Sequence, residues 1–168
     1  MEDVLHQAER LEKEYDWLAV AGLYRMALNL LLETDFSKQG EIHERLGYAL
    51  YRAAFQAEGS NDFQKGMRQA VEDYEGAKGF YGKTSEPEKL ARRLRCDAML
   101  AQLRYWLASS QQEKKNHIGE CCAFMKACLD ALEKAGAAYE YGRTFNQLST
   151  CIDLGFFFDW DFNAREKM

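Results

Sequence analysis

The sequence predicts an all-α fold, and three observations carry that prediction. β-branched residues are scarce, with 3 Val, 3 Ile and 4 Thr among 168 residues, whereas a buried sheet draws heavily on these residue types. Apolar residues recur with the three-then-four spacing of a helix face in one segment after another. The composition, 47% hydrophobic and 29% charged, is that of a folded globular chain rather than a disordered one.

Each apolar stripe predicts one helix, so that about seven helices are expected. A weak stripe covers 4–11, and stronger ones cover 17–31, 42–53, 63–77, 90–108, 118–132 and 141–155. Pro87 follows Ser85 and Glu86 in a capping-box pattern, where a missing backbone N–H costs nothing, so a helix should begin there. Gly82 and Gly136 stand where a left-handed residue would close a helix. Short connections between the stripes predict antiparallel hairpins.

The helix pairs resemble the tetratricopeptide (TPR) repeat, a helix–turn–helix unit of about 34 residues. The segment 46–51, Leu-Gly-Tyr-Ala-Leu-Tyr, is similar to the core of its first helix, and Trp17 and Tyr24 are similar to positions of its second helix. Small residues such as Gly47, Ala27 and Ala77 would let paired helices approach closely, with Tyr24 and Tyr74 filling the gap beside them. The resemblance implies a right-handed TPR-like superhelix in a single domain, with repeats at 1–36, 37–84, 85–136 and, incomplete, 137–168.

In TPR-like arrays the first helices of successive repeats line a concave groove that binds a peptide or a partner helix. The resemblance therefore implies a protein–protein interaction module or scaffold with no chemistry of its own. The residues expected to line the groove are Glu44, Tyr48, Tyr51, Arg52, Arg92, Arg95, Met99 and Asn146. Reversing the charges of Arg92 and Arg95 is expected to abolish partner binding while leaving the fold intact. The alternative, that these charges only form a solvated helix face, stays open.

One pattern suggests nucleotide binding. The segment 77–84 ends in Gly-Lys-Thr and fits a loose phosphate-loop pattern, but a phosphate loop needs a strand before it, and the residues before this segment follow a helical period. We interpret the segment as a helix end near Gly82 and expect no nucleotide.

A second pattern suggests a metal. His117, Cys121 and Cys128 share one edge of a predicted helix and are a weak candidate for a zinc site, which would still need further ligands. His6, His43 and His117 lie on three different predicted helices, so no nucleophile–base pair can be assembled. We therefore expect no enzyme and no cofactor.

Charge and cysteine content limit the partners and the cellular location expected for the chain. The net charge of −5 argues against nucleic-acid binding, and no apolar run approaches the roughly 20 residues of a membrane span. Five cysteines within helical patterns favour free thiols and a cytoplasmic location.

Two functions from other classes remain as alternatives, and the chain's extent is open as well. One alternative is a ligand-sensing regulatory domain of a larger signalling or transcription protein. The other is homo-oligomerisation through the aromatic C-terminal segment 156–162. A solenoid normally ends in a polar capping helix, so this aromatic end either folds back as a cap or indicates a piece of a longer protein.

Overall fold

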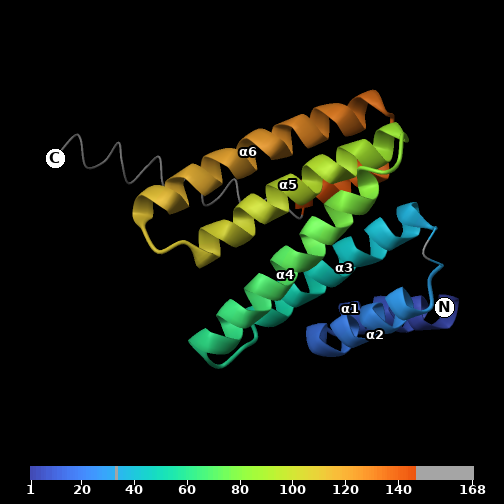
Figure 1. Ribbon diagram of the computed structural model, residues 1–168, viewed down its shortest axis with the longest axis horizontal. Helices are drawn as coiled ribbons and strands as arrows, with labels where there is room; N and C mark the ends of the chain where they lie inside the picture. Colours follow the sequence, from blue (N-terminus) through green and yellow to red (C-terminus); the bar gives the residue numbers. More distant parts are fainter. Residues whose placement is uncertain (33, 147–168) are drawn as a thin grey trace. The chain divides into compact units, whose positions relative to one another are not determined.

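The computed structural model describes residues 1–32 and 34–146, and all regular secondary structure among them is helical (Figure 1). Six helices are bounded in full: α1 Glu2–Lys13, α2 Trp17–Asn29, α3 Phe36–Ala54, α4 Ser60–Tyr81, α5 Pro87–Leu107 and α6 Gln111–Lys134. A further helical segment covers 138–146, where the described part ends. The prediction of an all-α fold is confirmed, and every predicted apolar stripe in the described residues lies on a helix.

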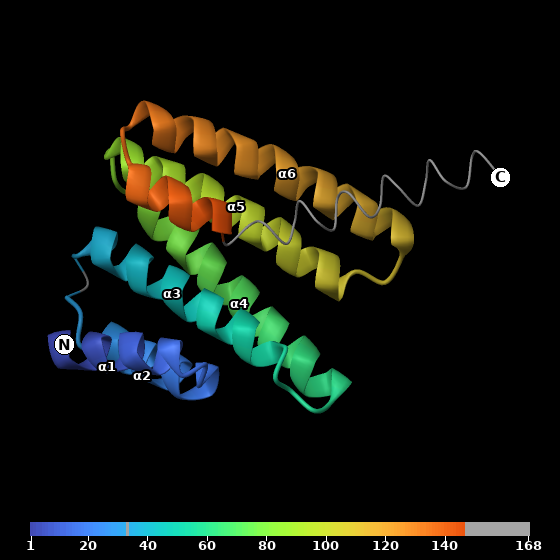
Figure 2. The same cartoon turned by 180° about the vertical axis from the view of Figure 1, so that it is seen from behind.

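The chain divides into two compact units, Met1–Ser85 and the part that begins at Glu86. The first unit holds α1 to α4, and the second holds α5, α6 and the segment 138–146. Within the units, α1 with α2, α3 with α4 and α5 with α6 form antiparallel pairs (Figures 1 and 2). The border between the units coincides with the predicted border between the second and third repeats, whereas the single domain stays a prediction.

Side-chain caps set several helix starts. The Asp16 carboxylate accepts from the backbone N–H of Ala19 at the start of α2, and Asp35 does the same at the start of α3. At α6, Ser110 and Glu113 form a reciprocal capping box, and the backbone N–H groups of this turn lower the pKa of the Glu113 carboxyl. Such caps satisfy N–H groups that have no partner within the helix.

Of the residues predicted to begin or end helices, some do so as expected and one does not. Pro87 is the first residue of α5, as the sequence predicts. Gly136 closes α6 with a left-handed φ of +67°, but Gly82 ends α4 with a right-handed φ of −64°. The expectation of a left-handed residue at Gly82 is therefore wrong, because the backbone N–H of Gly82 continues the α-helical pattern by bonding to Lys78 O.

The register of the α3–α4 pair is set by glycines that lie close against side chains of the opposite helix. At three levels along the pair, a Cβ added to the glycine would lie within 3.0 Å of the opposite side chain. These contacts pair Gly40 with Tyr81, Gly47 with Tyr74, and Gly66 with Ala54. Both tyrosine rings are buried, at 1% or less exposure. The sequence indicated Gly47 as a point of close helix approach and Tyr74 as a gap-filling ring; the structure sets these two against each other, which brings the two helix backbones close together.

The α1–α2 pair packs against α3 in the first unit through one face of α2. That face consists of the buried residues Trp17, Val20, Ala21, Tyr24 and Ala27. The α1–α2 turn contains Tyr15 in a left-handed conformation, with φ of 61°, and the side chain of Gln56 donates to the Tyr15 carbonyl. A non-glycine residue in this conformation is uncommon, and this hydrogen bond supports it from beyond the end of α3.

In the second unit, Ala91 of α5 packs with Cys128 and Leu132 of α6, and Leu94, Ala131 and Ala137 cover this cluster. Arg95 and Gln102 are also fully buried on α5. Across the described helices of both units, none combines the length and the apolarity that crossing a bilayer requires.

The interlock of α3 and α4 leads to a first prediction. The change Gly47→Ala should lower the free energy of unfolding by about 1–3 kcal/mol, because the new methyl group overlaps a buried ring that has no room to move. Gly79→Ala in α4 is the matched control, since nothing lies within 4 Å of a Cβ added there. It should raise stability by about 0.5–1 kcal/mol through helix propensity. Urea denaturation followed by circular dichroism measures both; equal effects would contradict the interlock.

Candidate functional site

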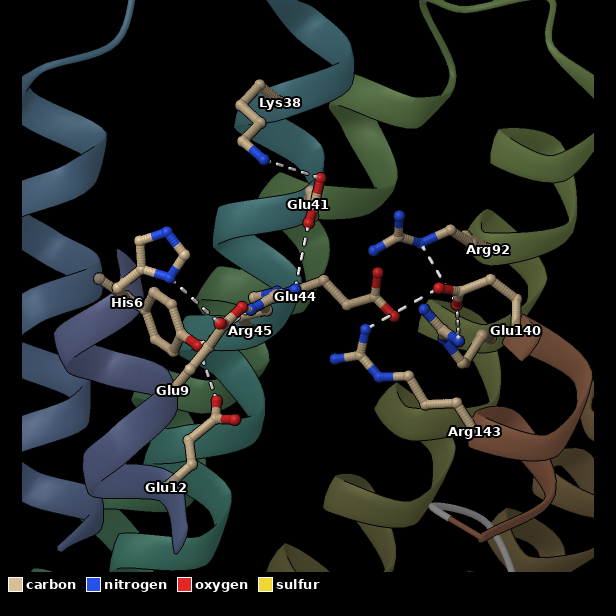
Figure 3. A network of polar contacts seen from close by, with 12 residues as sticks. His6, Glu9, Glu12, Lys38, Glu41, Glu44, Arg45, Arg92, Glu140 and Arg143 are labelled. Carbon is tan, nitrogen blue, oxygen red and sulfur yellow. Dashed lines mark hydrogen bonds and ion pairs between the residues drawn. The ribbon is translucent and has the colours of Figure 1, made fainter. Parts of the chain in front are cut away.

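Arg45 of α3 is the centre of a polar network that joins the first three helices (Figure 3). Its Nη1 donates to Glu9 Oε1 of α1 at 3.0 Å, and its Nη2 lies 3.4 Å from Glu41 Oε1 on the preceding turn of α3. The same Nη1 lies 3.4 Å from the Tyr24 hydroxyl of α2, and that hydroxyl donates to Glu12 Oε1 of α1 at 2.7 Å. One guanidinium thus links the charges of α1 and α3 to the buried end of a tyrosine.

The Tyr24 hydroxyl is a reliable donor in this network. Its residue is fully buried, and burial raises the pKa of the phenol, with the hydrogen bond to Glu12 acting in the same direction and the one from Arg45 opposing it. An ionised phenol would face the Glu12 carboxylate, so the neutral form is favoured. The Glu12 carboxylate is therefore fixed against α2 rather than pointing freely into solvent.

Carboxylates outnumber cations on the surface formed by α1 and α3, which we call the α1–α3 face. It comprises Glu2, Glu9, Glu12, Lys38, Glu41, Arg45, Tyr48 and Arg52. Glu9 keeps 46% of its side chain exposed, and Lys38 binds Glu41 at 3.3 Å. Glu2 lies seven residues before Glu9 and so on the same side of α1. The sequence of the first unit contains 15 acidic and 10 basic residues, so the whole net charge of the chain resides there.

The predicted groove residues of α3 fall on two different faces. Glu44 and Tyr51 lie on the side that meets α4, where they are 2% and 7% exposed. The Tyr81 hydroxyl donates to Glu44 at 2.7 Å. Tyr48 and Arg52, rotated from them by about 70° on average around the helix, are half-buried beside the start of α2.

Tyr48 and Arg52 form a small aromatic–cation cluster with Trp17. The Arg52 guanidinium lies 5.0 Å from the centre of the Trp17 ring, and its Nη1 donates to the Tyr48 hydroxyl at 3.0 Å. The rings of Trp17 and Tyr48 meet edge to face at 5.7 Å. Such a geometry favours a cation on the ring face. Of the predicted α3 residues, these two therefore lie where a partner could reach them.

In the second unit, Arg95 is fully buried and its guanidinium binds the carboxylate of Glu140, which is labelled in Figure 3. Its Nη1 donates to Glu140 Oε2 at 2.6 Å and to Thr144 Oγ1 at 3.0 Å. Arg92 is 3% exposed, with its Nε 3.9 Å from the same carboxylate, and Arg143 approaches the other carboxylate oxygen at 3.9 Å. Charge reversal at Arg95 would place two carboxylates together, so the expectation that this change leaves the fold intact has to be revised.

The two remaining predicted groove residues differ in exposure. Met99 is fully buried on α5, whereas Asn146 is exposed at the end of the described part. The binding role of all eight predicted residues stays a prediction, and the structure brings only Tyr48 and Arg52 together at an accessible place.

The weak metal candidate stays a prediction, and the structure shows a different contact for each of its three residues. His117 Nδ1 lies 3.0 Å from Glu120 Oε2, and Cys128 Sγ donates to the Ala91 carbonyl. Cys121 is disulfide-bonded, whereas Cys96, Cys122 and Cys128 are free. The three candidate ligands thus have separate partners. Among residues 1–32 and 34–146, no three His, Cys, Asp or Glu side chains gather closely enough to hold a metal ion.

The disulfide corrects the expectation of free thiols for Cys121. An odd number of cysteines still permits one bond, and pairing depends on contacts between distant segments, which helical periodicity does not reveal. The interpretation of Cys128 as a small buried hydrophobe agrees with its full burial.

The segment with the phosphate-loop pattern, 77–84, lies at the end of α4, as predicted from its helical period. Residues through Tyr81 belong to α4, and Lys83 follows its last turn. The Lys83 ammonium lies 4.6 Å from the Phe36 ring centre and 5.0 Å from that of Phe80. No strand precedes this segment in the described part of the chain, so the arrangement that cradles a phosphate is not formed there.

Sequence reasoning missed two polar contacts between helices. Arg45 binds Glu9, 36 positions away, and His43 Nδ1 lies 2.9 Å from Asp73 Oδ1, 30 positions away. His43 also stacks on Phe80 with ring centres 5.3 Å apart, which agrees with its predicted place between helices. No local pattern marks either pair.

Comparisons with known proteins add no relative, because no protein-family model, curated protein or solved structure matches this chain.

Removing the Arg45 guanidinium should loosen α1 from α3. We expect Arg45→Met to lower the free energy of unfolding by about 1–3 kcal/mol, since Glu9 and Glu41 lose a charged partner and Tyr24 a donor. Arg68→Met is the control, because Arg68 is exposed and bonds only within its own helix, to Gln64; it should stay within about 0.5 kcal/mol. Thermal melts measure both. A loss no larger than that of the control would contradict the linking role of Arg45.

Neighbouring arginines of α5 provide a second pair of variants. Arg95→Glu should lower the free energy of unfolding by about 3–5 kcal/mol, because it removes the cation that Glu140 faces and buries a new carboxylate beside it. Arg93 is exposed, so Arg93→Glu should change stability by about 0.5 kcal/mol or less. Denaturant titration distinguishes them, and equal stabilities would show that the Arg95–Glu140 contact is not formed in solution.

Proposed function

We propose that the chain is a non-catalytic protein–protein interaction module whose hairpins are TPR-like repeats. Three successive antiparallel helix pairs support this proposal, and so does the placement of Gly47 against Tyr74, the small-against-aromatic fit on which the resemblance depends. In such a module the first helix of each pair would meet the partner. For the first unit, these helices are α1 and α3.

The observation that carries the proposal is the surplus of carboxylates on the α1–α3 face. Glu9 and Glu41 share Arg45, and Lys38 also binds Glu41. Glu12 is bound to a neutral hydroxyl. Together with Glu2, the carboxylates of the face exceed its cations by one, and the first unit as a whole is acidic. A partner with Lys or Arg side chains would find several acceptors held by fixed helices, and held acceptors lose little conformational entropy on binding. We therefore propose a basic peptide or a basic partner helix.

Tyr48 and Arg52 would complete this surface at the end near α2. The half-buried tyrosine supplies contact area with few rotatable bonds, and contacts with Trp17 and Tyr48 already hold the arginine in place. Tyrosine and arginine are residue types that contribute strongly to binding. Glu44 and Tyr51, which the sequence also placed in the groove, would then support the surface from inside the α3–α4 pair.

Charge changes on opposite sides of α1 test the proposal. Glu2→Lys with Glu9→Gln should weaken binding of a lysine- and arginine-containing peptide, selected from a random library on the full chain, by at least about tenfold. Asp3→Lys with Glu14→Gln is the control: it makes the same change in charge at exposed residues, one in the first turn of α1 and one at its C-cap, outside the network around Arg45. Fluorescence anisotropy measures the affinities. Selected peptides without basic residues, or equal losses in both variants, would refute the proposed face.

A ligand-sensing role is the second candidate, and one observation favours it. A hollow of about 300 Å³ in the second unit is lined by Leu132, Glu133, Gly136, Ala137, Ala138 and Tyr141. This volume lies at the lower end of the range for small-molecule sites, and such sites usually gather several polar groups, whereas Glu133 supplies the only charge. The hollow therefore supports this role less strongly than the α1–α3 face supports peptide binding. The predicted aromatic oligomerisation segment, 156–162, lies outside the described residues.

A further inference from the structure

The outer side of α2 contains a stripe of exposed apolar residues, flanked by the exposed polar residues Arg25 and Asn29. Leu18, Met26 and Leu30 are 72%, 54% and 58% exposed, and Gly22 between them has open space at its Cβ position. With a spacing of four residues, these positions form one stripe along the helix. The opposite side of α2 is already buried against α1 and α3. A helix that is apolar on both sides is usually buried, so the outer stripe calls for a covering surface.

We infer that the outer stripe of α2 pairs with the same stripe of a second copy of this chain, in an antiparallel two-fold contact. The midpoint of the stripe is position 24, and a two-fold axis at this position sets Leu18 opposite Leu30 of the partner. It also sets Met26 of each copy opposite Gly22 of the other copy, so the same contact forms on both sides of the axis. A long flexible side chain then lies over a position without a side chain, which is the large-against-small fit of packed helices. A two-fold contact requires such self-complementarity, and the stripe has it.

Charge identifies a second copy as the occupant that this stripe can accept. α2 contains one charged residue, Arg25, among 13, while the first unit has an acidic surplus elsewhere. Two copies with a net charge of −5 each repel one another, and the outer side of α2 is where they can meet without bringing carboxylates together. Depletion of charge is also what distinguishes the cores of homodimer interfaces.

The size of the stripe sets the strength of the contact. A helix of 13 residues is about 20 Å long, and the three exposed side chains offer on the order of 100 Å² of apolar surface each. A stable complex buries about 800 Å² per partner. The exposed side chains Tyr15 and Leu32, just outside the two ends of α2, could add to the contact. The dimer is accordingly weak and forms at micromolar to millimolar concentration.

The experiment measures the mass of the full chain by sedimentation equilibrium between about 5 and 500 µM, a range that spans weak association. We expect the wild type to move from 19.4 kDa toward twice that mass as its concentration rises. Met26→Asp should raise the dissociation constant at least about tenfold, since it places a carboxylate in an apolar contact. Leu90→Asp, at an exposed apolar residue of α5, is the control and should dimerise like the wild type.

Exchanging the two residues tests the pairing itself. Gly22→Met alone sets methionine against methionine, and Met26→Gly alone leaves a gap, so both should weaken the dimer. The double variant restores one methionine opposite one glycine and should recover most of the affinity, with circular dichroism confirming that α2 remains helical in all of them. Failure of the double variant to recover would overturn the antiparallel pairing.

Salt separates this contact from the peptide binding proposed above. Raising sodium chloride from 50 to 500 mM should preserve or strengthen the dimer, because it screens the repulsion between two acidic chains. The same change should weaken binding of a basic peptide. A wild type that stays monomeric throughout, a dimer that persists in Met26→Asp, or monomers that bind vesicles of anionic lipid through the stripe would each overturn the inference.

Discussion

The close approach of α3 and α4 is the constraint on which the first unit depends. Gly40 and Gly47 are seven residues apart, as are Tyr74 and Tyr81, and in an antiparallel pair these equal spacings set both contacts at once. A shift of one residue would drive a ring into a backbone at each level, so the register is fixed by steric exclusion. Since Glu44 lies between the two glycines, its carboxylate necessarily faces α4, where the Tyr81 hydroxyl satisfies it. Burying a carboxylate costs little only when such a donor is present.

Because one side of α3 is fixed against α4, the side chains on its other sides are fixed in direction as well. Arg45, Tyr48 and Arg52 follow one another at three- and four-residue spacing, about a quarter turn from the glycines. They meet Glu9 of α1 and Trp17 of α2. The polar network around Arg45 is therefore a consequence of the apolar packing behind it. This order of dependence separates two roles: packing on α4 sets the orientation of α3, and Arg45 then links α3 to Glu9 of α1.

The sequence predicted the helices well and the site only in part, for one physical reason. Helix positions follow from local periodicity, and small residues such as Gly47 mark where paired helices can approach closely. The TPR resemblance placed Glu44, Tyr48, Tyr51 and Arg52 on one surface, and a rotation of α3 by about 70° decides which of them face α4. The structure separates them because α3 packs on α4 and on α1–α2 at once. The Arg95–Glu140 and Arg45–Glu9 contacts, 45 and 36 positions apart, have no local signal.

The two surfaces proposed for the first unit differ in the force that would bring a partner to them. On the α1–α3 face, fixed carboxylates attract a cationic partner at a distance, so association is fast at low salt and declines as salt is added. On the outer side of α2, attraction begins only at contact, because apolar burial acts over the surface that loses water. Tyr24 shows why the two surfaces can coexist: its ring lies in the core between α1, α2 and α3, so the outer stripe of α2 is turned away from the network that its hydroxyl joins. Occupation of one surface then leaves the other accessible, and a dimer would present two acidic faces to a partner that contains more than one basic segment.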